Sequence, residues 1–290
     1  MLDSQITQYE YVGIDIGGTN TRIGLFSSLD TPRFELLTKF PTVQSYQEQL
    51  ETLVTSIANF DNPSFGGVGV SIAGRIAKDG RSVVIAPNLT TYVHQPFAQD
   101  LADALHCPVR LAHDPVCGLL AEKKLGSLQS FERCAYLTVS TGTGAAIHLS
   151  KGDTHLTSSI EIGHQILDGN PLICLCGQVG CLETFTGGRQ LMLRYGHTPA
   201  EMADPAFWET FCAKLALGLI NLVMLTRVDA VAVSGAIVLN RPHLLTQLQK
   251  QVNALLRWAS LELRIAVLGE DAPLIGAATL IDTSEDTILH

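Results

Sequence analysis

The most constraining feature of the sequence is a short segment, residues 161–183, in which one histidine and three cysteines are crowded together. They are His164, Cys174, Cys176 and Cys181. A structural zinc ion takes four sulfur or nitrogen ligands in a closed tetrahedron. A single residue separates Cys174 from Cys176, which leaves too little chain for an unstrained disulfide. The spacing therefore favours a structural zinc site over a chance cluster of thiols.

Two glycines and two glutamates complete this segment. Gly177 and Gly180 permit the chain reversal that would bring Cys181 to the other ligands. Glu161 and Glu183 stand close to the ligands, and a closed zinc site has no open position for chemistry. We therefore expect the metal to hold these carboxylates as hydrogen-bond acceptors for a ligand rich in hydroxyl groups. The alternative is two solvated acids beside a structural metal, and the spacing leaves both interpretations open.

The composition predicts a globular protein of two domains. The chain has 290 residues, of which 46% are hydrophobic and 16% charged, as expected for a chain with a large apolar core. Its net charge is −9 and its pI is about 5.4. Because there is also no basic stripe, we expect no nucleic-acid partner.

The sequence also predicts where the protein is located. No apolar run reaches the roughly 18 residues that a membrane-spanning helix needs, so we expect no membrane partner. The polar N-terminus lacks the basic and apolar blocks of a signal peptide. Seven cysteines, an odd number with three in a metal pattern, fit a reducing compartment. A cytoplasmic location is therefore expected.

Residues 11–26 alternate between apolar and other residues on both sides of a glycine turn, which predicts a β-hairpin. Asp15 ends the first strand, and the turn consists of Gly17, Gly18, Thr19 and Asn20. Glycine allows an anion to approach backbone N–H groups, so the turn is a candidate phosphate-binding nest. Asp15 would then hold a hydrated Mg²⁺ ion over the phosphates. A plain hairpin turn needs the same glycines, however.

A second hairpin of the same kind is predicted at residues 136–149, with a turn that contains Thr141, Gly142, Thr143 and Gly144. Two such hairpins indicate two similar halves, each with a phosphate-cradling loop. One nucleotide held between two loops is the simplest interpretation. A third glycine turn, around Gly235, follows a predicted strand at residues 230–233.

The remaining pattern alternates helices with strands, as in α/β proteins. Asp114 stands just beyond a predicted strand at residues 109–112, where chemistry in such proteins is usually located. It would equally serve to cap the helix that begins at Pro115. Residues 205–226 predict a long helix that is apolar almost all round and hence buried in a core or a subunit interface.

Four motifs together resemble the ROK family of bacterial sugar kinases and sugar-responsive repressors, over nearly the whole chain. They are DIGGTNTRIGLF at residues 15–26, STGTGAAI at 140–147, EIGH at 161–164 with CLCGQVGCLE at 174–183, and LGEDAPLIGAA at 268–278. The resemblance implies an actin-like ATPase (ribonuclease H-like) α/β fold, with two α/β domains around a central cleft. The expected smaller domain comprises residues 1–114 and 275–290. The larger, with the zinc motif and a dimer interface, comprises residues 115–274.

The resemblance also implies roles for individual residues. Asp114 would be the catalytic base, and Gly235 would border the nucleotide with the two phosphate loops. The sugar would contact Asn88, His113, Asp114, Glu161, His164 and Glu183. The cofactors would be ATP, Mg²⁺ and a structural Zn²⁺ bound by His164, Cys174, Cys176 and Cys181. The substrate would be a hexose or N-acetylhexosamine, and the protein would form a homodimer.

Several positions depart from the family pattern. His113 replaces the usual Asn before the catalytic Asp, and Pro115 replaces a small residue. The sequence Ala73-Gly74-Arg75 stands in place of Pro-Gly-Pro, and Ser234-Gly235-Ala236 in place of a glycine triplet. None of these changes removes a phosphate loop or Asp114.

The sequence therefore predicts transfer of the γ-phosphoryl group of ATP to a hexose hydroxyl, most simply O6. One alternative is a sugar-binding regulator without catalysis. Only about ten residues precede the first strand, where family repressors carry a DNA-binding domain, and the chain is acidic. A second alternative is a degenerate ATPase, which an ADP-release assay with and without sugar would distinguish. The sequence leaves the identity of the sugar open.

Overall fold

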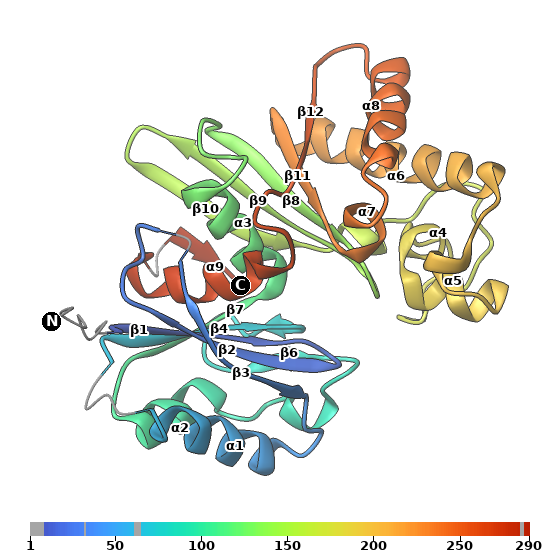
Figure 1. The fold of residues 1–290 in the computed structure, drawn as a ribbon. Coiled ribbons are helices and arrows are strands. Elements are labelled where there is room, and N and C mark those ends of the chain that lie inside the picture. Colours follow the sequence, from blue (N-terminus) through green and yellow to red (C-terminus); the bar gives the residue numbers. More distant parts are fainter. Residues whose placement is uncertain (1–8, 32, 61–64, 285–286) are drawn as a thin grey trace, which may run out of the picture. The chain divides into compact units, whose positions relative to one another are not determined.

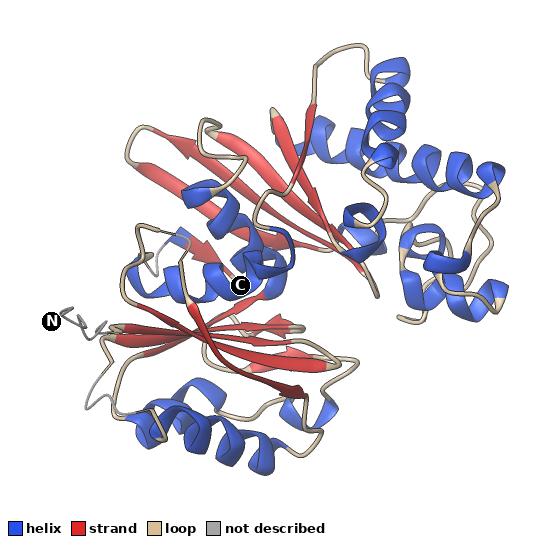
Figure 2. Cartoon of the chain, viewed as in Figure 1, coloured by secondary structure: helices blue, strands red, loops and turns tan. Residues whose placement is uncertain are grey.

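The computed structural model describes residues 9–31, 33–60, 65–284 and 287–290. The chain divides into two compact units: unit 1 comprises Met1–Leu125 and Asp271–His290, and unit 2 comprises Gly126–Glu270. Each unit is a β-sheet flanked by helices (Figure 2). Both therefore have the α/β architecture that the sequence predicts.

The division between the units differs from the expected boundaries, residues 114 and 275. Helix α3 (Asp114–Leu125) remains in unit 1 because it packs directly on α9 (Ala272–Thr279). The two backbones approach so closely that a Cβ on Gly276 would lie 1.8 Å from the carbonyl oxygen of Cys117. Both helices thus belong to the first unit.

The sheet of unit 1 has the strand order β3-β2-β1-β4-β7, in which β1 pairs antiparallel with β2 and parallel with β4 (Figure 1). β2 and β3 are also antiparallel, and β4 and β7 are parallel. The strands are β1 (Tyr11–Ile16), β2 (Asn20–Phe26), β3 (Glu35–Pro41), β4 (Gly67–Ile72) and β7 (Val109–His113).

Helices cover both faces of this sheet. The helices α1 (Tyr46–Ala58) and α2 (Phe97–Leu105) lie on one face, and α3 and α9 lie on the other (Figure 1). Ser45 caps α1, since its side chain accepts a hydrogen bond from the backbone of Glu48. The alternating apolar residues of β1 are fully buried, as the predicted hairpin requires. A small hairpin of β5 (Arg75–Ile76) and β6 (Val83–Ile85), the 3-10 helix η1 (Thr90–Tyr92), η5 (Leu280–Asp282) and β13 (Ile288–Leu289) complete the unit.

The sheet of unit 2 repeats this arrangement. Within the unit its strands have the order β10-β9-β8-β11-β12, again with two antiparallel pairs at one side and two parallel pairs at the other. The strands are β8 (Arg133–Val139), β9 (Thr143–Lys151), β10 (Thr154–Ile160), β11 (Ala230–Ser234) and β12 (Glu262–Ile265). The internal duplication inferred from the two glycine hairpins is therefore confirmed.

The helices of unit 2 pack around α6 (Pro205–Thr226), which supplies much of its core. This helix is long and apolar enough that its composition alone would also suit a membrane span, contrary to the expectation from apolar runs. Trp208, Phe211, Leu215 and Leu219 on α6 are buried among the other core residues, as expected of a core helix. The other helical segments are η2 (Ile162–His164), α4 (Glu183–Thr186), α5 (Gly188–Tyr195), η3 (Pro199–Glu201), α7 (Ala236–Leu239), α8 (His243–Leu255) and η4 (Gly269–Asp271), which runs into unit 1.

Candidate functional site

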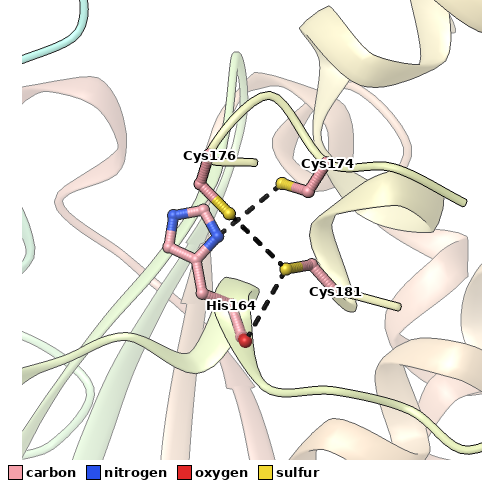
Figure 3. A group of neighbouring side chains, drawn as sticks. All are labelled: His164, Cys174, Cys176 and Cys181. Atoms are coloured by element: carbon pink, nitrogen blue, oxygen red, sulfur yellow. Dashed lines mark hydrogen bonds between the residues drawn. The ribbon is translucent and has the colours of Figure 1, made fainter. Parts of the chain in front are cut away.

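The histidine and three cysteines of the proposed metal site lie together in unit 2 (Figure 3). Their ligand atoms all lie within 4.8 Å of one another. Cys174 Sγ lies 3.8 Å from His164 Nδ1, and Cys176 Sγ lies 3.7 Å from Cys181 Sγ. With zinc–sulfur bonds of about 2.3 Å, a tetrahedron has sulfur–sulfur edges of about 3.8 Å. The donor set and its spacing therefore fit a zinc ion.

The backbone and the surrounding side chains shape this cluster. Gly177 and Gly180 have φ angles of 92° and 91°, so the reversal predicted for them uses a conformation that favours glycine. Burial raises the pKa of the Cys181 thiol to about 12. At Cys176 burial acts in the same direction, but hydrogen bonds from Gln178 outweigh it and lower the pKa to about 7. Cys176 is thus the thiol that loses its proton most easily.

The same segment is fastened to the second glycine turn. The carboxylate oxygen Oε2 of Glu183 accepts a hydrogen bond of 2.8 Å from the backbone N–H of Thr143. The hydroxyl groups of Thr143 and Thr186 lie 2.7 Å apart, one donating to the other. One N–H group of the predicted phosphate loop therefore already has an acceptor, Glu183, which comes from the end of the proposed zinc segment.

Unit 2 also brings the other predicted nucleotide-binding residues together. Thr141 accepts a 2.9 Å hydrogen bond from the backbone N–H of Arg189, at the start of α5. Gly235 follows β11, whose last residue, Ser234, pairs with Thr138 shortly before the turn. The turn residues Gly142 and Gly144 and the neighbouring Gly235 are all half-buried. Glu161 is exposed, and its carbonyl oxygen accepts the N–H of His164.

In unit 1, Asp15 is the centre of a network of charges. Arg22 Nη2 donates to Asp15 Oδ2 at 2.9 Å, and Ser71 Oγ donates to Asp15 Oδ1 at 3.0 Å. Arg22 Nη1 also donates to Asp271 Oδ1 at 2.8 Å. Burial raises the pKa of the Asp15 carboxyl, and Asp114 adds to this, whereas Arg22 and Ser71 act in the opposite direction.

The other predicted residues of unit 1 lie around this network. Asp114 is the first residue of α3, directly after β7, and its Oδ1 lies 3.1 Å from Nε2 of His113. Gly18 approaches Asn88 so closely that a Cβ on the glycine would lie 3.0 Å from the Asn88 Cβ. The hairpin turn is closed by a 3.0 Å hydrogen bond from Gly17 N–H to the carbonyl oxygen of Asn20. Thr19 and Asn20 are exposed in this turn.

Sequence reasoning missed the partners of Asp15. A signal for Arg22 was present, because a hairpin that turns at residues 17–19 places Asp15 opposite Arg22. Ser71 and Asp271 had no such signal. Ser71 comes from β4 and Asp271 from the start of the C-terminal part of unit 1, so only the tertiary fold brings Ser71 to Asp15 and Asp271 to Arg22.

Comparisons with known proteins agree with the geometry. The profile of the ROK family matches residues 11–284. N-acetylgalactosamine kinase AgaK from Shewanella sp. (strain ANA-3) is 30% identical over 211 residues, which cover 68% of this chain and 67% of that kinase.

Two solved structures share the fold. A ROK family glucokinase from Streptomyces griseus, in complex with glucose and AMPPNP, has a TM-score of 0.77 and 23% identity, covering 93% of this chain and 98% of that one. A ROK hexokinase from Thermus thermophilus has a TM-score of 0.76 and 26% identity, covering 92% of this chain and 96% of that one. The actin-like ATPase fold expected from the sequence is thereby confirmed. Since the family profile matches almost the entire chain, the protein belongs to the ROK family.

Proposed function

We propose that the protein is an ATP-dependent sugar kinase that transfers the γ-phosphoryl group of ATP to a hydroxyl group, O6 by preference, of a hexose or N-acetylhexosamine. One relative is an N-acetylgalactosamine kinase, and one structural neighbour is a glucokinase in complex with glucose and AMPPNP. Both support a sugar as the phosphoryl acceptor, and the AMPPNP of the glucokinase complex supports a nucleotide as the donor. The membership of the ROK family is consistent with this reaction.

The observation that carries the proposal is the edge of the unit 1 sheet at which the parallel strands β1, β4 and β7 end. In the register of this sheet Asp15 is aligned with Ser71, and Ser71 with Ala112. Asp114 therefore stands two residues beyond the row that contains Asp15, at the same carboxyl edge. Ligands of open α/β sheets bind at this edge, and here it carries two carboxylates.

The two carboxylates suit different tasks. Asp114 would accept the proton of the sugar hydroxyl as it attacks the γ-phosphorus, a step for which a general base within hydrogen-bond reach is needed. His113 Nε2 lies 3.1 Å from Asp114 Oδ1, so it would orient the carboxylate and leave Oδ2 for the sugar. The transition state of phosphoryl transfer is loose, and positioning therefore contributes more than covalent help.

Asp15 would hold Mg²⁺ through water. Magnesium sites commonly use one or two carboxylates together with the phosphates of the substrate. Oδ2 of Asp15 accepts two N–H groups of Arg22, at 2.9 Å and 3.3 Å, whereas Oδ1 accepts only from Ser71 and has a second lone pair for a water molecule. When bound, the ion would neutralise charge on the β- and γ-phosphates.

The sugar-binding groups of unit 2 would be positioned by a structural zinc. His164 faces the thiols through Nδ1, and its other ring nitrogen points away from them (Figure 3). That nitrogen would be available to a sugar hydroxyl. Glu183 uses Oε2 to hold Thr143, which leaves Oε1 as a second acceptor. With Glu161, these groups would form a fixed set of polar contacts for a sugar.

An ADP-release assay with a panel of sugars tests this function. The panel contains glucose, mannose, allose, fructose and the N-acetylated forms of glucosamine, mannosamine and galactosamine. We expect at least one sugar to stimulate ADP release strongly, and its 6-deoxy analogue to be inactive. A rate of ADP release that no sugar changes would instead indicate an ATPase. Stimulation by the 6-deoxy analogue would exclude O6 as the acceptor.

We also propose a homodimer in the cytoplasm, formed through an apolar surface on unit 2. Leu217, Met224 and Leu225 are exposed on one side of α6, with 85% of Leu225 accessible to solvent. Ile166, 63% exposed, adjoins this side, because its neighbour Gln165 accepts a 2.8 Å hydrogen bond from Asn221 of α6. Exposed apolar surface of this kind is typical of subunit contacts.

Light scattering after size-exclusion chromatography tests the dimer. Leu225→Glu should convert the dimer to a monomer, because an isologous contact carries each substitution twice. The matched control is Leu36→Glu in β3 of unit 1, where the leucine is 49% exposed. The proposed contact surface is wrong if both variants remain dimeric.

A further inference from the structure

Unit 1 contains a cavity of about 310 Å³ that none of the proposed catalytic or sugar-binding residues lines. It is bordered by the turn of the β5–β6 hairpin, by α2, by the first part of β7 and by the C-terminal segment. Arg110 of β7 lines it, four residues before Asp114. At about 3.3 Å per residue, Asp114 lies about 13 Å further along the chain. The cavity is therefore separate from the edge of the sheet that carries the two carboxylates.

The charges around the cavity are mainly positive, although the whole chain has a net charge of −9. Among the side chains that line the cavity, those of Lys78, Arg81 and Arg110 contribute three positive charges, and that of Asp79 contributes one negative charge. Among the residues that the structure describes, neither Lys78 nor Arg81 forms an ion pair. A concave site lined by one sign of charge concentrates ions of the opposite sign. The cavity thus favours an anion.

Hydrogen bonds hold the guanidinium group of Arg110 and the backbone of Arg81 in place before any ligand binds. Arg110 Nη1 donates to the carbonyl oxygen of Leu280 at 2.9 Å and also to that of Thr283. The backbone of Arg81 is held on both sides, since its N–H donates to Asp79 Oδ1 at 3.0 Å and its carbonyl oxygen accepts the N–H of Ala98. A preorganised site binds more tightly, because less conformational entropy is lost on binding.

The rest of the lining suits a ligand that also carries hydroxyl groups. Gln99 of α2 and the C-terminal His290 offer uncharged donors and acceptors next to the cations. Burial lowers the pKa of His290, which keeps its imidazole neutral near pH 7. Small-molecule sites usually measure about 300–1,000 Å³, so this cavity fits a ligand at the small end of that range.

We propose that this cavity binds a sugar monophosphate. The phosphate group would lie against Lys78, Arg81 and Arg110, because guanidinium and ammonium groups form charge-assisted hydrogen bonds with phosphate oxygens. The sugar hydroxyls would contact Gln99 and His290. The binding itself does not depend on the proposed kinase reaction, and it can be measured without ATP.

Lysine footprinting provides a local test. The rate at which an acetylating reagent modifies Lys78 is followed by mass spectrometry, with glucose 6-phosphate, inorganic phosphate or glucose added to the full-length protein. We expect glucose 6-phosphate to slow the modification of Lys78 several-fold and to leave exposed Lys151 of unit 2 unaffected. Sugar phosphate bound at the proposed active site would not change this readout, since Lys78 does not belong to that site.

A variant identifies the cations that bind the phosphate. Arg81→Gln should raise the Kd for glucose 6-phosphate, measured from the protection of Lys78, about 10- to 100-fold. This is the effect expected for the loss of a charge-assisted hydrogen bond. Arg257→Gln, an exposed arginine of unit 2, is the matched control and should leave Kd unchanged. The proposal is overturned if glucose 6-phosphate leaves the rate at Lys78 unchanged, if inorganic phosphate protects as tightly, or if Arg81→Gln binds like the wild type.

Discussion

The two units share one strand order, but their glycine hairpins are chemically different. In unit 1 the next-to-last residue of the first strand is Asp15, and it faces Arg22. In unit 2 the corresponding residue is Thr138, and it faces Gly144. The ends of the outer parallel strands also differ, since Asp114 follows β7 whereas Ala266 follows β12.

Unit 2 obtains its carboxylate from outside the hairpin. Glu183 reaches the turn from the end of the segment that carries the cysteines and the histidine. Repetition of the fold has therefore preserved the strands and not the chemistry at their ends. Unit 1 carries its own acid groups on strand ends, whereas unit 2 would depend on a metal to position those that it uses.

Removal of zinc should have the largest effect, and it should act on unit 2 alone. Structural zinc contributes about 10–16 kcal/mol of apparent binding free energy in small zinc-finger peptides. In unit 2 the packed core supplies part of the stability that zinc supplies in such peptides. A chelator should nevertheless lower the Tm by at least about 10 °C. Hydrogen exchange should rise in residues 161–183 and remain unchanged in β1 and β2.

Cysteine variants provide the control for this experiment. Cys181→Ser should bind no zinc, as measured by elemental analysis, and should reproduce the effect of the chelator. Cys107→Ser changes a free thiol of unit 1 outside the cluster and should retain one zinc ion per chain. An equal rise in hydrogen exchange in both units after chelation would show that the metal does not stabilise unit 2 selectively.

The second largest effect should come from Asp114→Asn in unit 1. The amide cannot accept the proton of the sugar hydroxyl, so kcat should fall about 10²- to 10⁴-fold. KM for the sugar should change little, because the amide keeps the shape of the carboxylate. Asp153→Asn, in the exposed turn between β9 and β10, is the control and should leave kcat unchanged. Near-normal turnover of Asp114→Asn would assign the base to another residue.

The sequence predictions succeeded for local features of the chain and failed for contacts between distant segments. Both hairpins were predictable, because alternation and a glycine turn are local signals. The strands β3 and β10 were missed, since half-exposed β3 shows no alternation and β10 is mostly polar. The four predicted zinc ligands came from spacing within a short segment, and the structure brings them together.

Contacts between distant segments were not predictable. The hydrogen bond from Thr143 to Glu183 joins residues on β9 and α4, and no pattern in the chain marks it. A single sequence thus indicates which residues can do chemistry, and tertiary packing decides what holds them.

Asp15→Asn tests the charge network of unit 1 and should have a smaller effect on stability. It removes one partner of Arg22, which keeps Asp271, so we expect a loss of about 1–3 kcal/mol of unfolding free energy. Thr138→Val changes the matching position of unit 2 and should cost less than about 1 kcal/mol. Native-state hydrogen exchange of β2 and β9 measures each unit separately. Equal losses at the two positions would remove the proposed chemical difference between the hairpins.

Glu183→Gln should have the smallest effect on stability, because the amide oxygen can still accept the N–H of Thr143. Replacing a charged acceptor by a neutral one should cost about 1 kcal/mol. KM for the sugar should nevertheless rise about tenfold, since the lost charge also weakens the bond to a sugar hydroxyl. Glu132→Gln, an exposed position directly before β8, should change neither quantity. A large loss of stability with an unchanged KM would show that Glu183 only stabilises the turn and does not contact the sugar.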